Sequence, residues 1–393
     1  MPTPPSPVSR RTFVRTSAAL AAAAVGAPSI VRAQRPLMLR FRTIPDPDGW
    51  HPALRLKGDW LVVELSDGVL SGYGEASHSN DDERCKQAVT ELFARHYADF
   101  TPSIENLARK EREIASIDAD LVTATAFSAL NQAFYDLLAR REQVPVWRLF
   151  RDRAPFAGVK LYTTINRTLQ TRSAEEYSTI VGEVRAQGFS IFKCAPFEAV
   201  NSPDNAVAKS ASGLATLNRL REEFPDLGIR VDFHERYARP EDFFAILPEL
   251  ERVRLDWIEE PFAMGAAYAE LKRRTRLRVS AGEIFWGDSR FAEIRRNKWA
   301  DVIMPDVKHV GGFGPLLGVM KASAGAIEVS PHNPAGPIST AASLHAAAVY
   351  PDLVRTLEYT FDRKRTRRAT GERVEGGVLL LTDKPGWGVE PPA

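Results

Sequence analysis

The stretch from residue 231 to residue 283 contains three apolar runs that each end in an acidic residue: VDFH (231–234), LDWIEEP (255–261) and VSAGE (279–283). Each run has the length of a buried β-strand, and a helix-length segment separates it from the next. Parallel strands joined by helices bring their carboxyl ends to one edge of a sheet, with about 4.8 Å between neighbours. We therefore expect Asp232, Glu259 and Glu283 to lie close together.

The same alternation continues on both sides of this stretch. The apolar runs end near Thr163, Lys193, Asp232, Glu259, Glu283, Asp306, His332 and Glu358. Eight strand–helix units predict an α/β protein with a closed (β/α)8 barrel of the TIM type rather than an open doubly wound sheet. The first strand is not followed by a Gly-rich dinucleotide-binding motif, which also disfavours a Rossmann fold. In such barrels the active site lies at the carboxyl ends of the strands.

Three convergent carboxylates repel one another unless a cation lies between them. Mg²⁺ favours a few carboxylate oxygens together with water and substrate oxygens. We therefore predict one Mg²⁺ per subunit, bound by Asp232, Glu259 and Glu283. The alternative is three solvated acids with unrelated roles.

Other strand ends supply groups for proton transfer. Asp306 and His332 end adjacent strands at equivalent depth, and a carboxylate bonded to a histidine makes a general base. Alternation along the second strand turns Lys193 into the barrel, and the last strand adds the inward acid Glu358. Taken alone, His332 would be a structural histidine; its place beside three predicted metal ligands favours catalysis.

The residues before the barrel predict an α+β unit at 34–155. Strand patterns cover 36–75, and helical patterns cover 81–98, 105–117 and 121–141. The barrel is assigned to 156–365. The remaining segment, 366–393, returns to strand and turn residues and is expected to pack on the N-terminal unit as a completion of it.

The first 33 residues have the pattern of an export signal. Arg10-Arg11-Thr12-Phe13 precedes an apolar run at 16–25, and Val31-Arg32-Ala33 supplies small residues for cleavage. The arginine pair resembles the twin-arginine signal of bacteria, which implies export by that machinery and a periplasmic protein. The run is too short for a stable membrane span. The alternative is a disordered basic N-terminus.

The composition is that of a globular protein. Of 393 residues, 44% are hydrophobic and 26% are charged. The 52 Lys and Arg residues nearly balance the 50 Asp and Glu residues, which gives no electrostatic basis for binding nucleic acid. We also expect a homo-oligomer. Two cysteines are too few for a disulfide framework.

Taken together, these motifs resemble the enolase superfamily, in particular its mandelate racemase/muconate lactonizing enzyme-like group. The resemblance rests on Asp232, Glu259-Glu260-Pro261, Gly282-Glu283, Pro305-Asp306 with Gly311-Gly312, and His332. Outside the barrel it rests on GYGEA (72–76), NQAFYDLL (131–138), VPV (144–146) and PGWGVE (385–390). Within the group, Asp232-Phe233-His234 and the pattern from Pro305 to Gly312 are most similar to acid-sugar dehydratases such as galactonate dehydratase.

This resemblance implies removal of the proton α to a carboxylate, with Mg²⁺ stabilising the resulting ene-diolate. It implies His332 as the base oriented by Asp306 and His234 as the acid for the departing 3-hydroxyl. It also implies Lys193 and Glu358, the latter as a hydrogen-bond donor if protonated, as further stabilising groups. The substrate would be an acid sugar, enclosed by the loops 46–51 and 77–82. Many members carry a second lysine where this chain has Ala195, so a racemase, epimerase or cycloisomerase is the weaker alternative. A non-catalytic periplasmic protein that binds acid sugars is the other.

Overall fold

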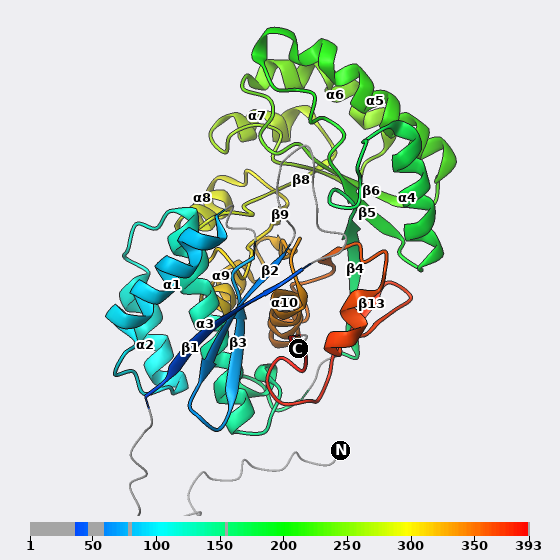
Figure 1. The fold of residues 1–393 in the computed structure, drawn as a ribbon. Helices are drawn as coiled ribbons and strands as arrows, with labels where there is room; N and C mark the ends of the chain where they lie inside the picture. Colours follow the sequence, from blue (N-terminus) through cyan, green and yellow to red (C-terminus); the bar gives the residue numbers. More distant parts are fainter. Residues whose placement is uncertain (1–35, 46–58, 78–80, 154–155, 392–393) are drawn as a thin grey trace, which may run out of the picture. The chain divides into compact units, whose positions relative to one another are not determined.

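The computed structural model describes residues 36–45, 59–77, 81–153 and 156–391. The segment before residue 153 forms an antiparallel sheet followed by three helices (Figure 1), as the sequence predicted. These elements are β1 (Met38–Ile44), β2 (Trp60–Ser66), β3 (Ser71–Glu75), α1 (Asp82–His96), α2 (Ile104–Ile114) and α3 (Leu121–Arg141). The proposed signal at 1–33 and the loop at 46–51 lie outside the described residues.

Each of these three helices begins directly after a residue with a short polar side chain. Asp81, Ser103 and Asp120 each accept a hydrogen bond from the backbone N–H three residues further on, at 2.8–3.1 Å. Such bonds satisfy one of the N–H groups that a helix leaves without an internal partner. The start of each helix is therefore determined by residues close to it in the sequence.

The remaining chain alternates strands and helices, as Figure 1 shows from green to orange. The strands are β4 (Gly158–Thr164), β5 (Ile191–Cys194), β6 (Gly228–Asp232), β7 (Trp257–Glu259), β8 (Arg278–Ala281), β9 (Val302–Ile303), β10 (Glu328–Val329) and β11 (Leu357–Thr360). The helices are α4 (Ala174–Ala186), α5 (Ala206–Glu223), α6 (Pro240–Val253), α7 (Ala267–Arg274), α8 (Ser289–Asn297), α9 (Phe313–Ser323) and α10 (Pro337–Val349).

These strands pair in parallel in the order β10-β9-β8-β7-β6-β5-β4-β11. The two ends of this sheet are joined by other hydrogen bonds. Val329 N–H donates to Leu353 O at 3.3 Å, and the Ser330 hydroxyl donates to Thr356 O at 2.9 Å. The arrangement is a barrel whose two end strands, β10 and β11, are joined by one backbone bond and one serine side chain rather than by a continuous backbone ladder.

Arg230 fills the interior one layer below the acidic strand ends. Its guanidinium carbon lies 4.1 Å from the ring centroid of Tyr162 and 3.6 Å from that of Trp257. Its Nη1 donates to the Thr356 hydroxyl at 3.0 Å. The negative faces of aromatic rings replace part of the water that a cation loses on burial. A positive charge is thus accommodated directly beneath the carboxylates.

Helix α3 is bonded to the loop that follows β9. Three of its polar side chains recur every three residues and a fourth is adjacent to the last of them; all four bind residues of 307–313. The bonds join Thr125 Oγ1 to His309 Nδ1 (3.0 Å), Ser128 Oγ to Gly311 N–H (3.0 Å), Asn131 Oδ1 to Phe313 N–H (2.7 Å) and Gln132 Nε2 to Val307 O (3.4 Å). The N-terminal unit thereby holds a loop of the barrel.

A second link runs from β3 to the start of α10. The buried carboxylate of Glu75 accepts hydrogen bonds from Gly336 N–H at 2.6 Å and from Ser339 N–H at 3.0 Å. A carboxylate at a helix N-terminus also compensates the partial positive charge of the helix dipole. Glu75 therefore fastens the N-terminal sheet to the barrel.

The C-terminal segment does more than pack on the N-terminal unit. Trp387 does so, donating its Nε1–H to Tyr73 O at 2.8 Å and its backbone N–H to Asp136 Oδ1 at 2.7 Å. The hairpin of β12 (Val374–Glu375) and β13 (Val378–Leu380), however, pairs antiparallel with the first residues of β4. The barrel sheet is therefore extended by the tail, which the sequence analysis did not predict.

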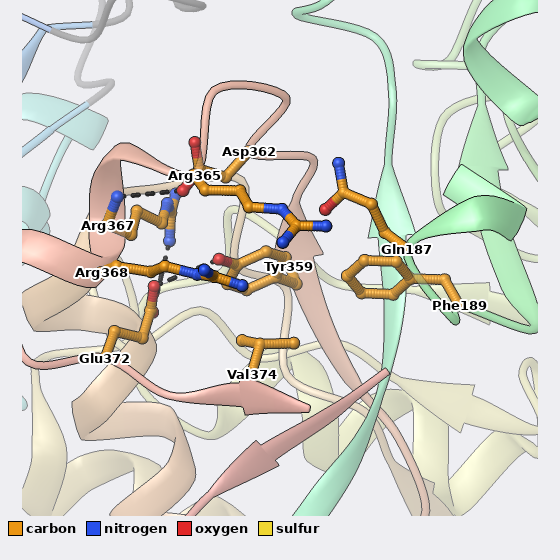
Figure 2. Close-up of a pocket in the computed structure, with 9 residues that line it drawn as sticks. All are labelled: Gln187, Phe189, Tyr359, Asp362, Arg365, Arg367, Arg368, Glu372 and Val374. Carbon is orange, nitrogen blue, oxygen red and sulfur yellow. Dashed lines mark hydrogen bonds and ion pairs between the residues drawn. The ribbon is translucent and has the colours of Figure 1, made fainter. Parts of the chain in front are cut away.

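A pocket lies where the tail meets β11, lined in part by Arg365, Arg368 and Tyr359 (Figure 2). At its inner side Arg367 lies over the Tyr359 ring, 4.8 Å from the centroid, and pairs with Glu372 at 3.6 Å. Burial raises the pKa of Glu372 to about 7, against the opposing charge of Arg367.

None of the helices in the described part of the chain is long and apolar enough to span a bilayer.

The close approach of β3 to α3 leaves no room for side chains at two glycines. A methyl group at Gly74 would lie 1.9 Å from Ala129 O, and one at Gly72 would lie 2.2 Å from Ala133 O. We expect Gly74→Ala to lower the free energy of unfolding by about 1–3 kcal/mol, as overpacking does elsewhere. Denaturant unfolding followed by circular dichroism measures this change.

Gly318→Ala is the matched control. Gly318 is an exposed residue of α9 with no atom close to the position of a new methyl group. This change should raise stability by about 0.5–1 kcal/mol, because glycine destabilises a helix interior relative to alanine. Equal effects of the two substitutions would contradict the packing described here.

Candidate active site

The three predicted metal ligands converge at the ends of β6, β7 and β8. Asp232 and Glu259 are the last residues of β6 and β7 and pair directly in the sheet. Glu283 follows β8 by two residues, after Gly282 turns the chain with a φ of +106°. One carboxylate oxygen from each residue lies within 4.8 Å of the other two. The sequence prediction of their convergence agrees with this geometry.

Lys193 lies at the centre of this acidic group. Its Nζ is 2.7 Å from Glu259 Oε1, 2.9 Å from Glu358 Oε1 and 3.3 Å from Asp232 Oδ2. All four side chains are almost fully buried. Burial alone would lower the pKa of Lys193, but the carboxylates of Glu259, Glu358 and Asp232 raise it far above its usual value. The lysine is therefore charged.

One ammonium does not neutralise this group of carboxylates. Glu283 adds a further acid, and the same repulsion is visible in Glu259, whose pKa is raised by burial and by Asp232. Three carboxylates with oxygens this close form a donor set that suits a hard divalent cation. These residues fit a metal site of that kind.

His332 bridges this acidic group and Asp306. Its Nδ1 lies 2.8 Å from Asp306 Oδ2, and its Nε2 lies 3.0 Å from Glu283 Oε2. The Asp306 bond fixes the ring so that Nε2 faces the carboxylates. Burial alone would lower the pKa of His332, but Glu283, Glu358 and Asp306 raise it to about 10. The imidazole stays protonated while these carboxylates carry uncompensated charge.

Asp306 has a second partner that the sequence analysis missed. The buried Lys308 donates its backbone N–H to Asp306 Oδ1 at 2.7 Å, and its ammonium contacts Oδ2. Burial opposes ionisation of Asp306, but Lys308, His309 and His332 together outweigh it and lower the pKa of Asp306. The signal available in the sequence was the position of Lys308, two residues after the aspartate that follows β9.

His234 lies on the other side of Asp232. Its Nε2 is 3.1 Å from Asp232 Oδ2, and its Nδ1 is 2.8 Å from Glu198 Oε1. Burial alone would lower the pKa of His234, but Asp232 and Glu198 raise it well above the usual value. Glu198 was not identified from the sequence, since it lies in the connection after β5 and outside the strand pattern.

Glu358 lies among hydrogen-bond donors. Its Oε2 accepts hydrogen bonds from Asn333 N–H at 3.1 Å and from the Tyr162 hydroxyl at 3.3 Å, while Oε1 pairs with Lys193. In this structure Glu358 therefore accepts two hydrogen bonds and pairs with one cation. Its role as a hydrogen-bond donor towards a substrate stays a prediction.

A further buried acid, Glu260, follows Glu259. It accepts hydrogen bonds from Gly282 N–H at 2.7 Å and Glu283 N–H at 3.4 Å. Burial and the charge of Glu283 raise the pKa of Glu260 to about 8. Glu260 thus supports the turn that carries Glu283.

Of the loop expected at 77–82, residues 78–80 lie outside the described residues.

Comparison with known proteins agrees with this geometry. Residues 56–150 match the model of the mandelate racemase/muconate lactonizing enzyme N-terminal domain, and residues 176–393 match that of the enolase C-terminal domain-like family. D-galactonate dehydratase from Cronobacter sakazakii is 27% identical over 354 residues, which are 86% of this chain and 90% of that protein. D-galactonate dehydratase from Klebsiella pneumoniae is 26% identical over the same shares.

Solved structures share the fold. A mandelate racemase/muconate lactonizing enzyme-like protein from Roseovarius sp. TM1035 has a TM-score of 0.78 at 23% identity, covering 91% of this chain and 93% of its own. The 3,6-anhydro-D-galactonate cycloisomerase from Zobellia galactanivorans has a TM-score of 0.76 at 19% identity, covering 91% and 96%. With its capping unit, its barrel and its three convergent carboxylates, this chain belongs to the enolase superfamily, in the mandelate racemase/muconate lactonizing enzyme group.

Proposed function

We propose that this chain is a Mg²⁺-dependent acid-sugar dehydratase, a carbon–oxygen lyase. It removes the proton α to a carboxylate and eliminates the 3-hydroxyl to give a 2-keto-3-deoxy acid. One observation carries the proposal. The pairs His332–Asp306 and His234–Glu198 contact different members of one carboxylate triad. This triad consists of Asp232, Glu259 and Glu283. The relation to D-galactonate dehydratases over most of the chain supports it.

His332 is assigned as the base. Its Nδ1 is held by Asp306, so Nε2 is the nitrogen that faces the triad and takes the proton from C2. Asp232, Glu259 and Glu283 would hold Mg²⁺, which would supply positive charge to the substrate carboxylate and to the acids around His332. Lys193 adds a fixed positive charge beside that position.

His234 is assigned as the acid. Protonated His234 donates its Nε2 proton to the departing 3-hydroxyl as the C3–O bond breaks, so that water leaves. The electron pair left at C2 forms the C2–C3 double bond of an enol. The enol then takes a proton at C3 and becomes the keto acid, so the overall change is the loss of one water.

An epimerase is the second candidate. A two-base reaction needs a second base besides His332, and the His234–Glu198 pair supplies one although Ala195 replaces the second lysine of other members. Such an enzyme interconverts C2 epimers without forming keto acid. A non-catalytic binding protein needs neither histidine pair and is the weaker alternative.

The decisive experiment is a screen of aldonic and aldaric acids, D-galactonate among them, with and without Mg²⁺. A 2-keto-3-deoxy product that forms only with the metal is the expected result. Epimers without keto acid would replace the dehydratase assignment by the second candidate. Failure to convert any member would overturn both.

Glu259→Gln should abolish Mg²⁺ binding and activity together, because the triad loses a charged ligand. Isothermal titration of the metal-free protein with Mg²⁺ measures binding without reference to turnover. Glu260→Gln is the matched control. Glu260 accepts hydrogen bonds from the Gly282 and Glu283 N–H groups through one oxygen, and an amide oxygen can accept the same bonds, so this change should preserve binding. Full turnover after exhaustive chelation would refute metal dependence.

His332→Asn should abolish removal of the C2 proton and lower kcat by about 10²–10⁴-fold, the usual contribution of an acid or base. His234→Asn should also block product formation while slow exchange at C2 continues in deuterated water. Mass spectrometry of recovered substrate detects this exchange. Loss of exchange in both variants would show that the two histidines do not act in successive steps.

We also propose that residues 1–33 direct export through the twin-arginine machinery. Arg10-Arg11 and the apolar run that follows support this proposal. Replacing both arginines with lysine should leave the precursor in the cytoplasm, as cell fractionation of a bacterial host would show. Normal periplasmic accumulation of that variant would exclude this route.

A further inference from the structure

We propose that Glu198 is a positioning residue that sets the orientation of His234 and thereby acts on the elimination step alone. The inference rests on the dehydratase function proposed above. Glu198 lies in the connection between β5 and α5, four residues beyond the end of β5. It belongs neither to the carboxylate triad nor to the His332–Asp306 pair.

Both oxygens of the Glu198 carboxylate contact a partner side chain. Its Oε1 lies 2.8 Å from His234 Nδ1, and its Oε2 is paired with Arg236. Arg172 Nη1 lies 4.0 Å from Oε1. The side chain is only 14% exposed. Arg236 therefore fixes one oxygen and leaves the other directed at the imidazole.

This contact determines which nitrogen of His234 faces the triad. With Nδ1 bound to Glu198, Nε2 is turned toward Asp232 Oδ2, 3.1 Å away. The backbone contributes to this orientation. His234 and Glu235 adopt φ values of 46° and 54°, and His234 N–H donates to Asp232 Oδ1 at 3.0 Å. A left-handed turn of two non-glycine residues is uncommon and persists where surrounding contacts define it.

Glu198 resembles Asp306 in its role but serves a different histidine. In both pairs a carboxylate binds Nδ1 and leaves Nε2 facing the same group of acids. Each carboxylate is in turn paired with a cation, Arg236 for Glu198 and Lys308 for Asp306. Loss of Glu198 should therefore disturb His234 and leave proton removal by His332 unchanged.

The test compares Glu198→Ala with Glu198→Gln. The amide oxygen of glutamine still accepts a hydrogen bond from Nδ1–H, whereas alanine cannot. We expect Glu198→Ala to lower kcat for keto-acid formation by about 10–100-fold, the range for removing a carboxylate that orients a functional histidine. Glu198→Gln should recover part of this loss. KM and exchange at C2 should stay within about threefold of the wild-type values, because Glu198 binds neither substrate nor His332 in this scheme.

Glu222→Gln is the matched control, because Glu222 is an exposed residue at the end of the neighbouring helix α5. The substrate is the acid sugar that the library screen identifies, with D-galactonate as the first probe. The wild-type enzyme is assayed alongside. If it forms no keto acid, the dehydratase function fails. If it does and Glu198→Ala retains full kcat, the role of Glu198 fails while the function stands.

A measurement without substrate tests the positioning directly. In protein labelled with ¹⁵N-histidine, the Nδ1–H of His234 should give a low-field proton resonance that His234→Asn identifies among the seven histidines. The resonance should vanish in Glu198→Ala and persist in Glu198→Gln. An unchanged resonance in Glu198→Ala would overturn the proposal, as would equal losses of elimination and C2 exchange, which would indicate a merely structural effect.

Discussion

Buried negative charge is the constraint on which this structure depends. Asp232, Glu259 and Glu358 surround one ammonium, and Glu283 adds a further acid at the rim. Moving carboxylates out of water is expensive unless cations and hydrogen-bond donors replace the water. Lys193 meets part of this demand, and Arg230 beneath it adds positive charge held by two aromatic rings. These two cations leave part of the negative charge uncompensated, and that remaining charge would attract a divalent metal.

The two histidines are coupled to the same negative charge. One nitrogen of each imidazole contacts a carboxylate outside the triad, and the other nitrogen contacts a member of the triad. The acids of the triad raise the pKa of both rings, so charge added to the triad alters the proton affinity of both together. Under the proposed function, metal binding and proton transfer would therefore be coupled through electrostatics at short range.

Much of this arrangement could be predicted from the sequence, because strand periodicity determines which residues end each strand. Asp232 and Glu259 are strand-terminal and pair directly, so alternation alone places them on the inner face. Residues beyond the strands were harder. Glu198 and Lys308 lie in connections whose course depends on tertiary contacts. The hydrogen bonds that Glu358 accepts come from Tyr162 on β4 and from Asn333 in the connection after β10. The hairpin at 374–380 was missed because a short strand carries little pattern of its own.

The polar face of α3 has a consequence for how this protein could change in evolution. Thr125, Ser128, Asn131 and Gln132 bind the loop that begins just after Asp306, so the capping unit helps to hold the partner of His332. Cap and barrel are thus not interchangeable modules. A recombined enzyme that took its cap from a relative would keep its chemistry only if the incoming helix offered matching hydrogen-bonding groups at these four positions. New substrate specificity is therefore more accessible through changes in loops than through exchange of the whole capping unit.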